Sequence, residues 1–120
     1  MTQYAVLIYG DESAFTDMSQ EAWAAMMDAH NAFGHAVVEQ GGKILGGEGL
    51  APSATATSVR GGAVTDGPFV ETKEQLGGFI LIEARDLNEA IQLASKWPGA
   101  RYGDIEVRPV EETLRDDARY

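Results

Sequence analysis

The chain has 120 residues, and 19 acidic against 9 basic side chains give it a formal net charge of −10. This charge disfavours binding to nucleic acids and to anionic membranes, both of which need clustered lysine and arginine. The chain has no cysteine, which excludes disulfides and thiolate chemistry, and it has no segment that resembles a transmembrane span or a signal peptide. We therefore expect a cytoplasmic protein with a single domain over 1–120 and a polar tail from about residue 111.

The first predicted strand covers residues 3–9, and both of its alternating faces are apolar. This pattern is typical of a central strand that is covered on both sides. A helix is predicted next, with Ser19 as its N-cap and Gly41-Gly42 at its end. Its apolar side chains are spaced three and four residues apart, and they are Trp23, Met26, Met27, His30, Phe33, Val37 and Val38.

The middle of the chain predicts a strand followed by a short hairpin. The strand covers 43–50 and contains several glycines. The hairpin strands, 55–60 and 63–65, are joined by the two-residue link Gly61-Gly62. A link of two glycines between β-type segments favours a tight hairpin turn.

The last third of the chain predicts a strand, a helix and another strand. Residues 72–75 match a capping box and predict one short helical turn. The strand over 78–84 is again apolar on both faces. Asp86 then caps a helix over about 87–97, and the alternation in 104–109 predicts a half-exposed strand.

The order of these elements predicts an α+β fold of the ferredoxin-like βαββαβ type, with a short extra hairpin. Two helices can cover only one face of such a sheet, yet the two central strands are apolar on both faces. Burial of the second face would favour association strongly. We therefore expect a homodimer in which the two sheets face each other.

A long segment in the second half of the chain resembles a known family. Residues 64–79 contain Asp66-Gly67-Pro68-Phe69 and are similar to the hallmark of the DGPF branch of the YCII-related domain family. The similarity extends over about residues 3–110, with supporting segments at 4–11, 46–50, 100–103 and 106–109. The resemblance implies a bacterial protein that forms a dimeric α/β barrel, and it implies no defined reaction.

The resemblance also implies a histidine in the first helix and an aspartate just before a proline after the second helix. His30 lies near the first of these positions. At the second position this chain has Trp97-Pro98, so the His-Asp pair is incomplete.

Two residues are candidates for catalysis. His30 lies among apolar side chains, and an imidazole that titrates near neutral pH suits general acid–base catalysis. The alternative is a structural histidine bonded to a backbone carbonyl. Asp66 can orient or protonate a substrate, or it can simply form its turn. His35 lies about 140° further around the helix than His30, so the two histidines cannot share a metal ion.

A further set of residues are candidates for substrate binding. They flank glycines, or they can hold a small anion or stack on a ring, and they are Tyr9, Glu48, Arg60, Glu71, Lys73, Arg101 and Tyr102. The alternative is ordinary pairing, such as a surface ion pair between Glu71 and Lys73 or internal salt bridges of the arginines. Because the sequence has no metal-ligand spacing, phosphate-binding loop or nucleophile elbow, we expect no cofactor and no metal ion.

Two functions remain open at this point. The first is a small cofactor-independent enzyme in which His30 transfers a proton on a small polar substrate. The second is a non-catalytic module that binds a metabolite or acts as a regulatory accessory, which the resemblance links to sigma-factor signalling. Both functions imply a homodimer with a small-molecule ligand, and neither involves nucleic acid or a membrane.

Overall fold

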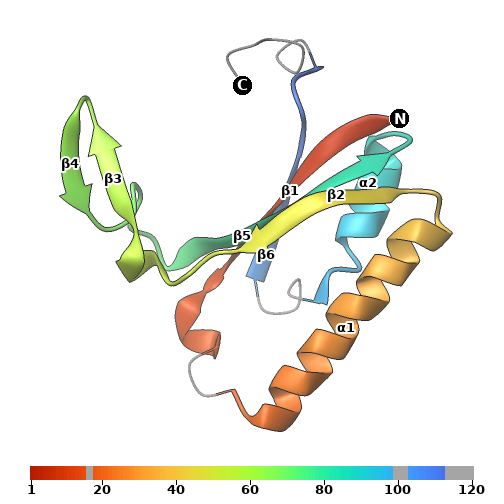
Figure 1. Cartoon of the computed structure of the whole chain (residues 1–120), viewed down its shortest axis with the longest axis horizontal. Helices are drawn as coiled ribbons and strands as arrows, with labels where there is room; N and C mark the ends of the chain where they lie inside the picture. Colours follow the sequence, from red (N-terminus) through yellow and green to blue (C-terminus); the bar gives the residue numbers. More distant parts are fainter. Residues whose placement is uncertain (16–17, 99–102, 113–120) are drawn as a thin grey trace.

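The computed structural model describes residues 1–15, 18–98 and 103–112, and Figure 1 shows its elements. Residues 113–120 of the expected tail lie outside this part. Along the chain the elements are β1 (Thr2–Asp11), the 3-10 turn η1 (Glu12–Phe15), α1 (Gln20–Glu39), β2 (Lys43–Gly49), the 3-10 turn η2 (Ser53–Thr55), β3 (Thr57–Arg60), β4 (Ala63–Asp66), β5 (Glu74–Ala84), α2 (Leu87–Ala94) and β6 (Gly103–Pro109).

Four strands form an antiparallel sheet in the order β2-β5-β1-β6, whereas β3 and β4 pair only with each other. The central strands β1 and β5 pair from Thr2–Ala84 to Asp11–Glu74, with a β-bulge after Ile8. They are the two strands that the sequence predicts to be central. The strand order and the two helices confirm the α+β class and are compatible with a ferredoxin-like fold.

Both helices pack on the same face of the sheet, where they enclose the hydrophobic core. This face takes every second residue of β1 and β5, together with the inner side chains of α1 and α2. The buried apolar residues are Tyr4, Val6, Phe33, Val37, Ile80, Ile82, Ala84, Ala90, Leu93 and Ala94. No helix in the described part of the chain has both the length and the apolarity of a transmembrane span.

The opposite face of the sheet is also apolar at its centre, as the sequence predicts. Its central side chains are Ala5 and Leu7 on β1 and Phe79 and Leu81 on β5, and all four are half-buried. We call this surface the open face. Neither helix covers it, because both pack on the face that carries Val6 and Ile82.

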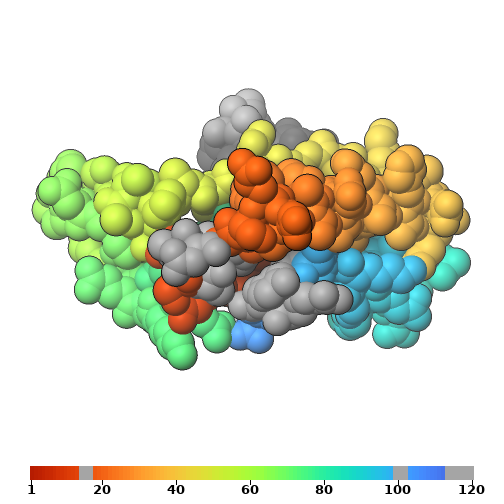
Figure 2. Space-filling model, turned by 90° about the horizontal axis from the view of Figure 1, so that it is seen from below, coloured from red at the N-terminus to blue at the C-terminus, as the bar shows by residue number. Residues whose placement is uncertain are grey.

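The β3–β4 hairpin projects beyond the sheet as an arm. Its strands pair from Thr57–Asp66 to Arg60–Ala63, and Gly61 and Gly62 form the turn at positive φ. Figures 1 and 2 show the arm at the left end of the molecule, clear of both helices. The sequence predicts this hairpin and its glycine link correctly.

The predicted helical turn at residues 72–75 is wrong, because β5 already begins at Glu74. The Thr72 hydroxyl donates to the Glu74 carbonyl instead of capping a helix. The Gln75 amide donates to the carbonyls of Val70 and Thr72, each at 3.0 Å. The polar side chains that suggest a capping box therefore hold an extended segment that pairs with β1.

The helices differ from their predictions in two respects. In α1, only Phe33 and Val37 of the predicted stripe are buried, while Trp23, Met27 and Val38 are exposed. The stripe is thus wider than the surface that the sheet can cover. Helix α2 ends at Ala94 and not at 97, and the following residues form a turn.

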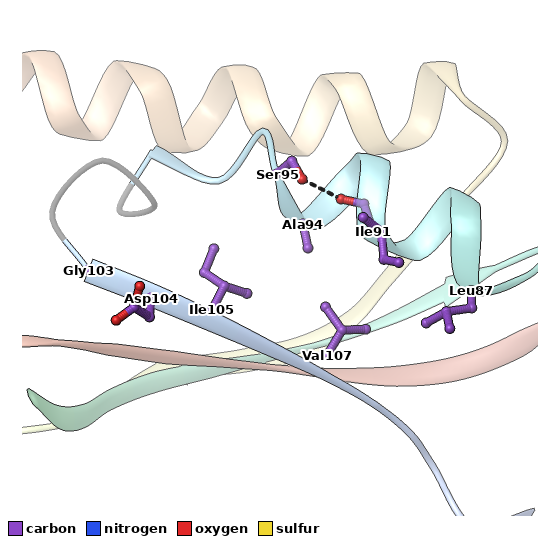
Figure 3. A pocket seen from close by; sticks show the side chains of 8 residues that line it. All are labelled: Leu87, Ile91, Ala94, Ser95, Gly103, Asp104, Ile105 and Val107. Atoms are coloured by element: carbon purple, nitrogen blue, oxygen red, sulfur yellow. Dashed lines mark hydrogen bonds between the residues drawn. The ribbon is translucent and has the colours of Figure 1, made fainter.

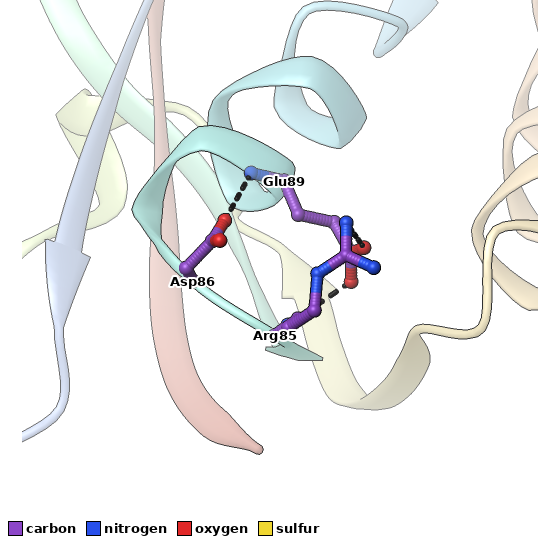
Figure 4. Close-up of polar contacts among 3 residues, drawn as sticks. All are labelled: Arg85, Asp86 and Glu89. Atoms are coloured by element: carbon purple, nitrogen blue, oxygen red, sulfur yellow. Dashed lines mark hydrogen bonds and ion pairs between the residues drawn. The ribbon is translucent and has the colours of Figure 1, made fainter.

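Two acidic side chains and one basic side chain stabilise the start of α2 (Figure 4). The Asp86 carboxylate accepts from the Glu89 backbone N–H at 2.9 Å. The buried Glu89 carboxylate accepts in turn from the Arg85 backbone N–H at 3.0 Å and pairs with the Arg85 guanidinium at 3.1 Å. These bonds satisfy amide groups that the first turn of a helix otherwise leaves free.

Candidate functional site

His30 lies in the middle of α1, on the side that turns toward the sheet. The helix begins at the N-cap Ser19, whose hydroxyl accepts from the Ala22 backbone N–H at 3.1 Å. Counting from this start, the helical period places His30 close to Phe33 and Met26. Its side chain is half-buried, at the border between the core and the surface.

The hydrogen bond of the imidazole ring defines which nitrogen can act on a ligand. Nδ1 of His30 lies 2.7 Å from the carbonyl oxygen of Met26, one helical turn earlier. A carbonyl only accepts hydrogen bonds, so Nδ1 carries the proton and donates. In the neutral ring, Nε2 then has a free lone pair.

The imidazole is part of a cluster of three aromatic rings. Trp97 packs edge-on against His30, with ring centroids 4.4 Å apart and planes at 74°. It packs in the same way against Phe33, at 5.1 Å and 86°. The turn after α2 places the indole here, since the Trp97 backbone N–H donates to the Ala94 carbonyl at 3.0 Å. The residue before Pro98 is therefore in direct contact with His30.

A groove of about 770 Å³ runs between α1 and the turn after α2. Met26 and Trp97, which both contact His30, form part of its wall. Lys96 contributes the charged side chain among its lining residues. The other lining residues are small or apolar, apart from one hydroxyl, and they are Ala22, Ala25, Ala29, Ala32, Phe33, Ala36, Ser95 and Pro98.

The second catalytic candidate, Asp66, lies on the arm and not on α1. It is exposed at the end of β4, and the next residue, Gly67, has a positive φ of 96°. The Gly67 backbone N–H donates to the Ala56 carbonyl at 2.8 Å, which closes the base of the hairpin. The described contacts do not bring Asp66 and His30 together.

Arg60 has two partners within the arm and the turn that follows it. Its guanidinium lies 4.4 Å above the ring of Phe69 and donates to the Phe69 carbonyl. The cation–π contact uses one face of the guanidinium, and the hydrogen bond uses one of its N–H groups. They fix the turn that contains Asp66, Gly67 and Pro68 against β3.

The loop before β5 brings charged residues to the end of the sheet. Among the described residues no ion pair forms between Glu71 and Lys73. The positive charge of Lys73 instead contributes to the lowered pKa of Asp11 and opposes the rise in the pKa of Glu74. For Asp11, hydrogen bonds from the Ser13 hydroxyl and backbone N–H have a larger effect in the same direction.

Sequence reasoning misses a carboxyl pair in this region. A side-chain hydrogen bond with Asp104 raises the pKa of Glu74, and the repulsion between the two carboxylates adds to this effect. The pair forms because β1 lies between β5 and β6 in the sheet and holds both near its end. Only the strand order reveals this pair, so no local motif could have predicted it.

The remaining binding candidates are dispersed. Tyr9 is half-buried on β1, opposite Asp104 and just after the bulge, and Glu48 is exposed on β2 opposite Phe79. Arg101 and Tyr102 lie outside the described residues. Binding roles for this set, and a catalytic role for Asp66, stay predictions.

A second cavity of about 540 Å³ lies between α2 and β6 (Figure 3). Leu87 and Ile91 of α2 face Ile105 and Val107 of β6 across it, with Asp104 at one end. The Ser95 hydroxyl donates to the Ile91 carbonyl at 2.7 Å, within α2 and its C-cap. This cavity therefore offers apolar contact but contains no histidine.

Within the described ranges, no group of three or more histidine and carboxylate side chains has the arrangement of a metal site. The candidate site consists of the His30 imidazole, its aromatic neighbours and the adjoining groove.

Comparison with known proteins gives two matches. The profile of the YCII-related domain matches residues 2–113. An uncharacterised protein of Rhizobium meliloti (strain 1021) is 41% identical over 113 residues, which cover 89% of this chain and 90% of that protein. The first match spans His30, Trp97 and the Asp66–Phe69 turn alike.

Proposed function

The chain belongs to the YCII-related domain family, and on this basis we propose that it is a small cofactor-independent enzyme in which His30 transfers a proton. The substrate is a small molecule that binds in the groove beside α1. The sequence of the Asp66–Phe69 turn supports membership of the DGPF branch within the family.

The hydrogen bond between His30 Nδ1 and the Met26 carbonyl carries this proposal. It leaves Nε2 as the nitrogen that can take a proton from a substrate. After protonation Nδ1–H still donates to the same carbonyl, so the ring keeps its orientation through the reaction. A general base needs this fixed geometry as well as a suitable pKa.

The groove supports the proposal because its wall includes two residues that contact His30. Its small side chains leave room for the body of a ligand, and Lys96 can attract a polar or anionic end. A substrate with one polar end and a compact apolar part fits this lining.

One observation favours a second function, a module that binds a metabolite without converting it. The neighbour of His30 is the Trp97 indole, where the family resemblance implies an aspartate. An indole has no negative charge with which to stabilise a protonated imidazole, as a carboxylate does. In this role the same groove would bind the ligand, and the protein would act as a regulatory accessory.

We further propose that the protein works as a homodimer in the cytoplasm. The support is the open face, where half-buried Leu7, Phe79 and Leu81 have no helix above them. Two such faces in contact would form a barrel with all four helices on the outside.

The test is a thermal-shift screen of small polar and aromatic metabolites on the wild type, His30→Ala and His35→Ala. His35 is an exposed histidine of the same helix, so its variant is a matched control. A ligand at about a hundred times its dissociation constant stabilises the folded state by about 2.7 kcal/mol. We expect this shift in the wild type and in His35→Ala, and its loss in a folded His30→Ala protein.

Each result of the screen has a distinct meaning. If a ligand stabilises His30→Ala as well as the wild type, His30 is not part of the site. For a ligand that depends on His30, NMR spectra of ligand and protein over time separate the two functions. A new product supports the enzyme, whereas an unchanged bound ligand contradicts it and supports the module.

A further inference from the structure

The arm exposes an apolar pair that nothing in the described chain covers. Val59 and Val64 are directly opposite each other in the hairpin. They are 66% and 69% exposed, although both are β-branched residues at the centre of their strands. Since an isolated two-stranded hairpin is marginally stable in water, such a pair is expected to be buried.

The other side of the arm is already occupied by its own chain. The buried Ser58 hydroxyl donates to the Gly67 carbonyl at 2.8 Å, and the Arg60 guanidinium covers the Phe69 ring. These contacts fix the arm against the Asp66–Phe69 turn. Because side chains alternate along a strand, Val59 and Val64 lie on the side that faces away from these contacts.

We propose that the Val59–Val64 side of the arm docks on a second copy of this chain. The inference rests on the self-association proposed above, and it adds a second contact to the open face. The arm leaves the sheet where Gly49 of β2 pairs with Gly78 of β5, next to Phe79 of the open face. The base of the arm thus adjoins the edge of the proposed interface.

The charge distribution also favours a second copy as the partner. The whole chain carries a net charge of −10, and two copies therefore repel each other over most of their surfaces. Residues 50–70 contain Arg60 and Asp66 as their charged residues, so this segment is neutral. The arm can approach another copy without this repulsion, and it can bury both valines there.

The absence of cysteine makes a direct test possible, because one introduced thiol is the sole reactive site. Val59→Cys places a thiol in the proposed contact. Val38→Cys is the matched control, since Val38 is 67% exposed on α1, away from the arm. The rate of alkylation by iodoacetamide is measured across a dilution series, and the mass is measured by sedimentation on the same samples.

We expect the Val59→Cys thiol to react at least about tenfold more slowly in the associated protein than after dissociation by dilution. The Val38→Cys thiol should react at one rate throughout. In unlabelled protein, Val59→Thr combined with Val64→Thr keeps the β-branched shape and should raise the dissociation constant at least about tenfold. Val38→Thr should not change it, and circular dichroism confirms folding of each variant.

The outcomes separate this inference from the proposals on which it rests. A wild type that stays monomeric overturns both the homodimer and the docked arm. A dimer in which the Val59→Cys thiol reacts as fast as in the monomer overturns the docked arm and leaves the open-face contact intact. Binding to His30 is measured independently and changes neither conclusion.

Discussion

Two carboxyl groups lie close together at one end of the sheet. Glu74 is the first residue of β5, and Asp104 is the second residue of β6. Their hydrogen bond is strongest when one of them is protonated, which is why the pKa of Glu74 is raised. Nearby Lys73 opposes this shift, but the two effects of Asp104 are larger. As the pH falls, Glu74 in this pair therefore takes up a proton earlier than an isolated glutamate would.

Asp104→Asn should lower the pKa of Glu74 toward its ordinary value. The amide can donate to the ionised carboxylate, so the hydrogen bond no longer favours protonated Glu74, and the repulsion between carboxylates disappears. A raised pKa stabilises the fold fully below the ordinary value and loses this contribution as the pH rises through the raised value. Relative to the variant, the wild type should therefore gain stability as the pH falls from about 7 to about 4. Carboxyl NMR shifts of Glu74 and urea unfolding at several pH values measure both effects.

Asp66→Asn is the control, since Asp66 is an exposed carboxylate on the arm and is not among the groups that shift the pKa of Glu74. It should leave the titration of Glu74 unchanged. An unaltered pKa of Glu74 in Asp104→Asn would contradict the assigned cause.

The sequence predicts the position of His30 but not its neighbour. The helical period alone places His30 at the border of the core, as the structure shows. The contact with Trp97 depends on α2 ending at Ala94, which frees the indole to turn toward α1. The Glu74–Asp104 pair is equally hidden, because strand pairing brings the two residues together from distant parts of the chain.

At the scale of elements, the edge strand β2 depends on close backbone packing. A Cβ atom at Gly47 would lie 2.6 Å from the Phe79 carbonyl and 3.0 Å from Cα of Ile80, both rigid backbone atoms of β5. A Cβ atom at the neighbouring Gly46 would have nothing within 4 Å. The same substitution at these two neighbouring glycines therefore compares a position where a Cβ atom clashes with one where it has free space.

Gly47→Ala should destabilise the fold by about 1–3 kcal/mol, since β2 must shift away from β5. Gly46→Ala should be neutral or stabilise by up to about 1 kcal/mol, through the lower entropy of its unfolded chain. Chemical unfolding followed by circular dichroism gives both values. Equal stabilities of the two variants would contradict this account of the β2–β5 contact.

Most elements can be predicted from the sequence because their signals are local. Alternating apolar residues mark β1 and β5, the serine N-cap marks the start of α1, and Gly61-Gly62 marks the hairpin. The prediction fails at residues 72–75, where a capping pattern is present but pairing of Glu74 with Asp11 extends β5. Long-range pairing there outweighs the local preference for a helical turn.

At the scale of the molecule, the open face is the feature from which we predict a second copy as partner. We expect a particle of twice 12.9 kDa by sedimentation equilibrium at micromolar concentrations. Because each copy carries a charge of −10, added salt should strengthen the association by screening the repulsion. Leu81→Glu should weaken it by placing a charge at the centre of the interface.

Leu87→Glu is the matched control, because Leu87 is an exposed leucine of α2, on the helical side of the sheet. It should leave the association unchanged. A mass of 12.9 kDa at every concentration, or equal association of both variants, would contradict the open-face contact.

The second apolar face is predictable from the sequence, since both central strands have it. The partner that covers this face cannot be predicted, because the sequence pattern of one chain does not specify how two chains are arranged. The α+β class and the central position of β1 and β5 are confirmed, while the barrel and the dimer remain predictions that the experiments above address.

The strand order has a consequence for folding during synthesis on the ribosome. The first strand made, β1, lies between β5 and β6, which begin at Glu74 and Gly103. The nascent chain therefore carries an unpaired apolar strand until more than half of its length has been synthesised. Closure of the sheet must wait for contacts of high sequence separation, which slow folding and expose the strand to aggregation. Of the strands of this sheet, β1 is thus the one that chaperones have the longest time to bind.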